Sequence, residues 1–294
     1  GWILYLINPC FFTFGSTPAC TPRGTQAVHY NFSPDTTTPQ QNPVAVNNSG
    51  VAPAAPTQNC ANGSCDIVLP VPYLSQGRAP RECEYAGICA TNPTAGLDIH
   101  GENRKWAGVT CGAASFVSAY LYVSGNTTDS QVFLRNFIND YYRCGIHNLP
   151  PGRSASIRGY DATNAPRTAD DPLCAYRLGI GGDPNTMVRI LKTQLRANGT
   201  HSMQLSAQNI FRELSAGHPI VIGGVKKTAT PGIFEAHPHF TVIIGMHGYN
   251  QAANSFTDLV IHDVGYGAGA LMNYQNFQSL QASSHLRSGI AVAM

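Results

Sequence analysis

The sequence predicts an α+β domain over residues 67–294, preceded by an extended N-terminal arm. Helix signals are concentrated between residues 111 and 217, and short β-rich segments bounded by Gly and Asn follow from residue 219 onward. Helices that precede strands, rather than alternate with them, indicate segregated layers and an antiparallel sheet. Residues 21–66, by contrast, show no helical period and contain few large apolar side chains.

The first 66 residues divide into an apolar segment, 1–20, and an arm or linker, 21–66. The apolar segment opens with GWILYLINPCFFTF, which is too short to span a bilayer and lacks the flanks of a signal peptide. Three interpretations stay open: a strand packed on the domain, a strand that adds to the sheet edge of a neighbouring copy, or a remnant of a targeting sequence. The arm is rich in Pro, Thr, Asn, Gln and Ala, as linkers are.

Four helices are expected in the first half of the domain. Asp129 and the pair Asp183-Pro184 are signals for helix starts. Three glycines are expected to end helices: Gly125, Gly199 and Gly217. The predicted helices cover residues 111–124, 130–143, 185–198 and 207–216. In the first of them, one face is formed by Ala114, Val117 or Ser118, and Leu121.

Strands are expected where apolar and polar residues alternate or where short apolar runs are bounded by Gly and Asn. They cover residues 66–76, 219–225, 239–249, 256–265 and 288–294. All but the first follow the helices, so the sheet is built mainly by the second half of the domain.

Composition excludes several classes of function. The net charge is +2 and only 12% of residues are charged, so no basic surface for nucleic acid is expected. The aromatic residues are scattered without the Arg or Lys that nucleic-acid stacking requires. No segment predicts a membrane span. We expect no metal and no cofactor, because zinc-ribbon spacing, HExxH, GxGxxG and the P-loop motif are all absent.

Nine cysteines in a chain with few charged residues indicate an oxidising compartment, extracellular or periplasmic. Sequential pairing is the simplest of many possible arrangements. It gives the disulfides Cys10–Cys20, Cys60–Cys65, Cys83–Cys89 and Cys144–Cys174. The odd count leaves one thiol over, and Cys111 has no near partner in the sequence.

Cys111 is the candidate nucleophile. It begins an apolar helix rich in small residues, in the context WAGVTCGAASF. The partial positive charge and the unpaired N–H groups of a helix N-terminus favour the thiolate over the thiol. The alternative interpretation is a buried or disulfide-bonded cysteine.

His239 and Asp263 are the candidate partners of Cys111. His239 begins the strand HFTVIIG, and Asp263 follows the next strand, DLVIH. Adjacent antiparallel strands bring the start of one beside the end of the other, so the imidazole can contact both Cys111 and the carboxylate. His237 is an alternative base, although Pro238 interrupts the ladder between the two histidines. Asn254 is a remote alternative to Asp263.

Residues 67–294 resemble the papain-like cysteine peptidases, and within them the C39-like peptidase family. The resemblance lies in the ordered elements VPYLSQ, Cys111-Gly112, ELSAGHPIVIGG, His239 in HFTVIIG, and Asp263 after the next strand. It implies a papain-like fold with a nucleophile helix and a C-terminal antiparallel sheet. It also implies that Cys111 is the nucleophile, His239 the general base and acid, and Asp263 the residue that orients the imidazole.

The resemblance further implies that Gln76, at the end of VPYLSQ, donates to the oxyanion beside the backbone N–H of Cys111. In the family this Gln precedes the Cys by only a few residues, whereas 34 residues intervene here. Either the intervening stretch is an inserted loop held by Cys83 and Cys89, or Gln76 is not the oxyanion donor.

The expected function is that of a secreted cysteine peptidase-like hydrolase, which cleaves amide bonds of a peptide or protein substrate through a thioester. An amidase or acyltransferase is the nearest enzymatic alternative, because the three residues specify acyl transfer and not its acceptor. The alternative of another class is a structural subunit of an extracellular polymer that assembles through residues 1–20.

Overall fold

The computed structural model describes residues 4–6, 27–29, 56–76, 110–126, 128–138, 141, 176–177 and 181–294. The chain divides into two units, Gly1–Pro43 and Val44–Met294. In the first unit, β1 (Leu4–Leu6) pairs antiparallel with β2 (Ala27–His29). The apolar N-terminal segment therefore contains a strand. Self-assembly through residues 1–20 stays a prediction, because most of that segment lies outside the described residues.

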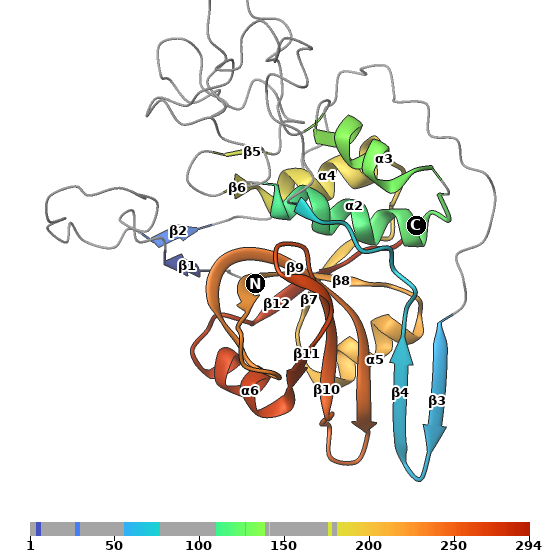
Figure 1. The fold of residues 1–294 in the computed structure, drawn as a ribbon, viewed down its shortest axis with the longest axis vertical. Helices are drawn as coiled ribbons and strands as arrows, with labels where there is room; N and C mark the ends of the chain where they lie inside the picture. Colours follow the sequence, from blue (N-terminus) through green and yellow to red (C-terminus); the bar gives the residue numbers. More distant parts are fainter. Residues whose placement is uncertain are drawn as a thin grey trace, which may run out of the picture. The chain divides into compact units, whose positions relative to one another are not determined.

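The second unit is an α+β domain with an eight-stranded, antiparallel sheet, as predicted (Figure 1). The main path of the sheet runs in the order β11-β10-β9-β8-β12-β7, and a hairpin of β3 and β4 pairs with β9. The strands are β3 (Thr57–Ala61), β4 (Ser64–Val68), β7 (His201–Gln204), β8 (Ile220–Lys227), β9 (Phe234–Asn250), β10 (Asp258–Asp263), β11 (Gly267–Asn273) and β12 (Ser288–Ala291). A two-stranded pair, β5 (Tyr176–Arg177) and β6 (Gly181–Gly182), stands apart from this sheet.

Strand β9 organises the sheet, because three neighbours pair with different parts of its 17 residues. Residues 234–243 pair with β8, residues 242–247 with β10, and residues 245–250 with β4. A bridge between Gly232 and Met272 also ties β11 to the connection between β8 and β9, so the sheet curls on itself. The part of β9 that contains His239 thus lies beside the end of β10.

Five helices are described in this unit: α2 (Cys111–Val123), α3 (Ser130–Phe137), α4 (Pro184–Thr193), α5 (Ala207–Ser215) and α6 (Tyr274–Ala282). Helix α2 contacts β8 and β9 of the sheet, and α3 and α4 contact α2 (Figure 1). Every residue from Gly112 to Val123 is consequently buried, rather than the single face expected from the sequence. None of the helices in the described residues is long and apolar enough to cross a membrane.

The predicted helix starts are confirmed by side-chain caps. The Asp129 carboxylate accepts hydrogen bonds from the first turn of α3, and the Asp183 carboxylate caps α4, with Pro184 at its first position. The prediction that the second of these helices extends to Gly199 is wrong. It ends at Thr193, and Arg196 adopts a φ of 59°, which no helix can contain.

The strand expected over residues 66–76 begins earlier and ends earlier. It is β4, which ends at Val68 because Pro70 and Pro72 have no N–H group to donate to a ladder. Its partner β3 lies within the range assigned to the linker, so the sheet begins at Thr57. The sequence Asn62-Gly63 forms the two-residue turn of this hairpin, with φ values of 51° and 77°.

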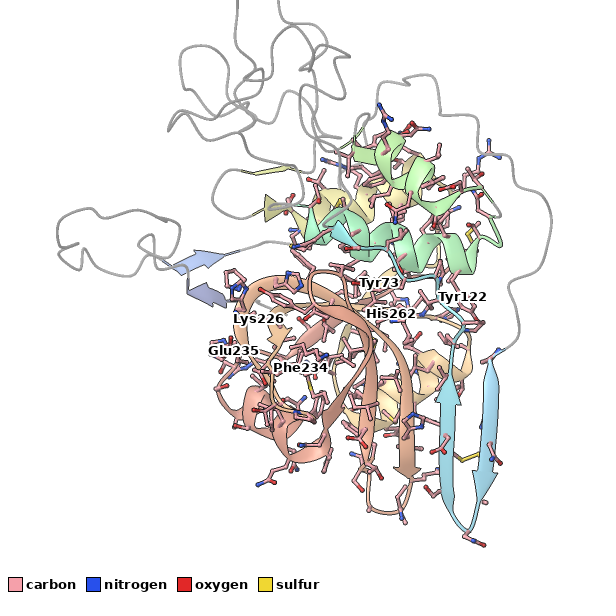
Figure 2. All side chains as sticks on the ribbon, in the orientation of Figure 1. Tyr73, Tyr122, Lys226, Phe234, Glu235 and His262 are labelled. Atoms are coloured by element: carbon pink, nitrogen blue, oxygen red, sulfur yellow. A yellow bond between two sulfur atoms is a disulfide. The ribbon has the colours of Figure 1, made fainter. Side chains whose placement is uncertain are left out.

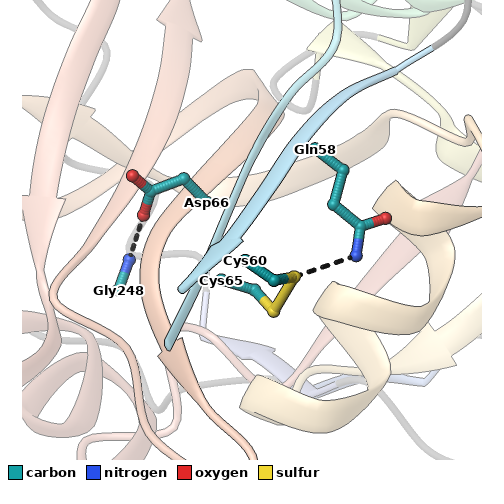
Figure 3. Close-up of a disulfide and its surroundings, with 5 residues drawn as sticks. All are labelled: Gln58, Cys60, Cys65, Asp66 and Gly248. Carbon is teal, nitrogen blue, oxygen red and sulfur yellow. Dashed lines mark hydrogen bonds between the residues drawn. A yellow bond between two sulfur atoms is a disulfide. The ribbon is translucent and has the colours of Figure 1, made fainter. Parts of the chain in front are cut away.

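The predicted Cys60–Cys65 disulfide is confirmed and joins directly opposite residues of the β3–β4 hairpin (Figure 3). Asp66 then fastens the hairpin to β9, because its carboxylate accepts a hydrogen bond of 2.7 Å from the Gly248 N–H. The other three predicted disulfides, Cys10–Cys20, Cys83–Cys89 and Cys144–Cys174, lie outside the described residues.

Replacing both Cys60 and Cys65 by Ser should lower the free energy of unfolding by about 2 kcal/mol, because the bond closes a short loop in the unfolded chain. Urea unfolding followed by circular dichroism measures the change. An unchanged midpoint would contradict this entropic account of the disulfide. The accessibility of Cys111 in the folded variant serves as the control and should not change.

Candidate active site

Cys111, His239 and Asp263 lie in one hydrogen-bonded chain, although they come from three different elements. The Nε2 atom of His239 is 2.8 Å from Oδ1 of Asp263, and the side chain of Cys111 is close enough to the same imidazole to raise its pKa. Because Nε2 is engaged by the carboxylate, Nδ1 is the ring nitrogen left for the sulfur. The three residues that the sequence predicts as a site are therefore adjacent.

Strand pairing explains why His239 and Asp263 meet. Strands β9 and β10 are antiparallel, and Val242 is opposite His262 in their register. This register places the last residue of β10 beside the first buried residues of β9. His239 is only 5% exposed and Asp263 is fully buried, so the contact between them is shielded from solvent.

The side-chain carboxylate of Asp263 receives four hydrogen bonds. Oδ1 accepts from His239 and from the N–H groups of Gly265 and Tyr266, and Oδ2 accepts from the N–H of Lys227 at 2.8 Å. Burial by itself raises the pKa of a carboxyl group. Here the His239 ring and the backbone donors outweigh burial and lower the pKa of Asp263 below its usual value. The residue is therefore a carboxylate at neutral pH.

The environment of His239 favours its protonated form. Burial alone lowers the pKa of a histidine, but the hydrogen bonds to Asp263 and Cys111 outweigh burial and raise the pKa of His239 to about 9. The imidazole consequently holds a proton at neutral pH between two groups that carry or can carry negative charge.

Cys111 is the one free cysteine among the described residues, and it is partly exposed. It is the first residue of α2, and the side chain of the preceding Thr110 caps none of the N–H groups in the first turn. The Thr110 carbonyl accepts the first helical hydrogen bond, from Ala114. Among the described residues, the first turn of α2 thus has no side-chain cap.

Residues 69–76, which we call the strap, connect β4 to the site and pass between α2 and β10. The Leu69 N–H donates to the Ile244 carbonyl, and the Ser118 hydroxyl of α2 donates to the Pro72 carbonyl. At the other end, the Gln76 N–H donates to the Val264 carbonyl at 3.0 Å. The strap is thus fastened to the sheet and to α2 along its length.

The strap brings the Gln76 amide beside His239. A Cβ atom on Gly265 would lie 3.2 Å from both Nε2 of Gln76 and Cε1 of His239, so the two side chains border the same small space. The 34 residues between Gln76 and Cys111 do not keep Gln76 from the site. Its assignment as oxyanion donor stays a prediction.

The two alternative residues lack the required contacts. The His237 ring lies 6.2 Å from that of His239, and its buried Nδ1 has no hydrogen-bond partner among the described residues. The register between β8 and β9 shifts beside Pro238, as expected for a residue without an N–H group. Asn254 lies in the turn between β9 and β10, where its side chain accepts from the Gln208 N–H.

Sequence reasoning assigned no role to Tyr266. Its ring is 52% exposed and packs edge-on against His239 at 5.8 Å. The Lys226 ammonium lies 5.6 Å from the centre of the Tyr266 ring and is paired with Glu235 at 3.0 Å (Figure 2). An aromatic surface therefore borders the buried histidine on its solvent side.

The part of the chain that the structure describes contains no group of three or more His, Cys, Asp or Glu side chains arranged to hold a metal ion. The chain matches no protein-family model, and neither the curated proteins nor the solved structures include a similar one.

Replacing Cys111 by Ala should lower the pKa of His239 from about 9, because the ring loses one of the two partners that favour its proton. The chemical shift of the His239 Cε1–H, followed by NMR against pH, measures this value. Replacing the exposed His285 by Gln serves as the control and should leave the titration unchanged. A His239 pKa that is the same with and without Cys111 would mean that the two side chains do not interact.

Proposed function

We propose that this protein is a cysteine hydrolase of papain-like fold that cleaves amide bonds, with peptides as its favoured substrates. One observation carries the proposal: an unpaired cysteine at a helix start contacts a histidine that is hydrogen-bonded to a buried carboxylate. This is the arrangement that nucleophilic catalysis by a thiolate requires.

In the first step, the Cys111 sulfur attacks the amide carbonyl carbon while His239 holds the proton. A C–S bond forms, and the carbonyl oxygen becomes an oxyanion. The N–H groups at the start of α2 and the Gln76 amide are the donors that we assign to this oxyanion. His239 then transfers its proton to the nitrogen as the C–N bond breaks, so an amine leaves and a thioester remains.

In the second step, a water molecule attacks the thioester. His239, now neutral, takes a proton from the water as the C–O bond forms. The C–S bond then breaks, a carboxylic acid leaves, and the thiolate and the protonated imidazole are restored. Asp263 stays ionised throughout, because it orients the ring and stabilises its positive charge.

The compartment belongs to the same proposal. The Cys60–Cys65 disulfide supports an oxidising environment, extracellular or periplasmic, in which such a bond persists. In that environment Cys111 must not form a disulfide with another cysteine. Its contact with His239 inside the fold supports a free thiol.

A thiol-reactive alkylating probe should label Cys111 in the native protein, and replacing Cys111 by Ala should abolish both this labelling and the hydrolysis of a mixed peptide library. Mass spectrometry of the labelled protein identifies the site. The same protein unfolded in urea is the control for probe reactivity. An unlabelled Cys111 in the native protein would count against the proposal, whereas labelling without peptide cleavage would favour an amidase or acyltransferase.

Replacing Gln76 by Ala should lower kcat by roughly 100-fold to 1,000-fold, the usual cost of losing one oxyanion donor, and should change KM little. The matched control is Gln251→Ala, in the exposed turn between β9 and β10. Steady-state kinetics on one peptide substrate measures both constants. If the kcat of the Gln76 variant equals that of the control, Gln76 is not the oxyanion donor.

A further inference from the structure

His262, the residue before Asp263, is a buried histidine that takes no part in the steps above. It is 7% exposed, and both of its ring nitrogens are hydrogen-bonded. Nε2 lies 3.0 Å from the Val71 carbonyl oxygen, and the Gly269 N–H donates to Nδ1 at 3.1 Å. A carbonyl only accepts and an N–H only donates, so the ring is neutral and carries its proton on Nε2.

The hydrogen bond between Gly269 and His262 lies at an irregularity in the sheet beside Asp263. In the pairing of β10 with β11, Ile261 is opposite Ala270 but Asp263 is opposite Gly267, so β11 contains one extra residue at this point. Gly269 adopts a φ of 62° there, and its N–H points to the His262 ring. The imidazole therefore stabilises the bulge in β11, opposite the end of β10 from which Asp263 reaches His239.

The bond to Val71 fixes the strap on the other side of the ring. Tyr73 packs edge-on against His262 at 5.4 Å, and its hydroxyl donates to the Asp263 carbonyl at 3.3 Å (Figure 2). The strap is thereby held to β10 at two consecutive residues, shortly before it ends at Gln76. The side chains of His262 and Tyr73 thus join the segment that carries Gln76 to the strand that carries Asp263.

We propose that His262 is a positioning residue for the reaction: as a neutral donor and acceptor it holds the strap that carries Gln76 and the end of β10 that carries Asp263, and its protonation releases the β11 bulge at Gly269. The inference rests on the proposed function, because it assigns a role to His262 through Gln76 and Asp263.

The surroundings of His262 oppose its protonation. Among the described residues, the strap presents Tyr73, β11 presents the Gly269 N–H and β9 presents Val242; the Asp263 carboxylate is engaged by His239 and by backbone donors. Burial outweighs the Val71 carbonyl and lowers the pKa of His262 below 6.5. A proton on Nδ1 would face the Gly269 N–H, so two donors would meet.

The sign of the resulting pH dependence follows from these contacts. Below the ordinary histidine pKa of about 6.5, the unfolded chain takes up a proton at this position that the folded chain resists. The free energy of unfolding therefore falls as the pH drops below that value. The β11 bulge is the segment released first, because Nδ1 accepts from the Gly269 N–H only in the neutral ring, whereas Nε2 donates to Val71 in either form.

The first test uses NMR on the whole wild-type chain and needs no activity. Near pH 6.5, where an ordinary histidine is half protonated, long-range ¹H–¹⁵N spectra should show the His262 ring mainly neutral, with its proton on Nε2. On acidification, the Gly269 amide should lose protection against hydrogen exchange, because protonated Nδ1 no longer accepts from it. A mainly protonated ring, the Nδ1–H form, or unchanged protection of this amide would overturn the inference.

The second test uses kinetics. His262→Phe keeps a flat ring but loses both hydrogen bonds, and it should lower kcat on the order of 100-fold with a smaller effect on KM. The Gln side chain of His262→Gln is a neutral donor and acceptor that does not titrate. This variant should therefore have a higher kcat than His262→Phe, and it should lack the decline of kcat in acid that His262 causes. The control His285→Gln, at an exposed position, should behave as wild type.

The two hypotheses can fail separately. A folded His262→Phe protein with wild-type kcat, or a His262→Gln protein with the wild-type acid profile, would overturn the positioning role even in an active enzyme. Absence of any hydrolysis by the wild-type protein would instead overturn the proposed function, and the NMR result would still decide how His262 is bonded. If His262→Phe does not fold, the acid profile of His262→Gln decides.

Discussion

The burial of the Asp263 carboxylate is the constraint on which the rest of the site depends. An ionised carboxylate without solvent is stable only when its oxygens are hydrogen-bonded. Its donors come from β9, from the turn after β10 and from the end of β8, so these elements must be placed together for Asp263 to be charged. The raised pKa of His239 depends in turn on that charge.

Local sequence signals predicted the parts of the fold that depend on local chemistry. Asp129 and Asp183 cap helices where expected, and Cys111 begins the helix that Gly125 follows. Predictions that required tertiary information were less accurate. The hairpin at Asn62-Gly63 lies in a stretch whose composition resembles a linker. Strand β7 carries a weak pattern, because its partner β12 lies far away in the sequence.

The candidate site shows the same division. The site formed by Cys111, His239 and Asp263 could be predicted from the sequence, because each residue stands at the start or end of an element and antiparallel pairing brings such positions together. The approach of Gln76 to His239 depends on the strap, whose bonds to Ile244, Ser118 and Val264 join segments far apart in the chain. No local pattern distinguishes His262 from an ordinary strand residue, because its role follows from a bulge in β11.

Two histidines close to Asp263 have opposite protonation states, and their surroundings explain why. His239 faces a carboxylate and a thiol, so the charged ring is favoured; His262 faces one carbonyl and one N–H, so only the neutral ring satisfies both partners. Environments that separate the pKa values of similar groups are typical of sites that carry out acid–base chemistry. The same fold therefore requires His239 to be protonated and His262 to be neutral. Both conditions are met together only between the pH at which His262 gains a proton and the pH near 9 at which His239 loses its own.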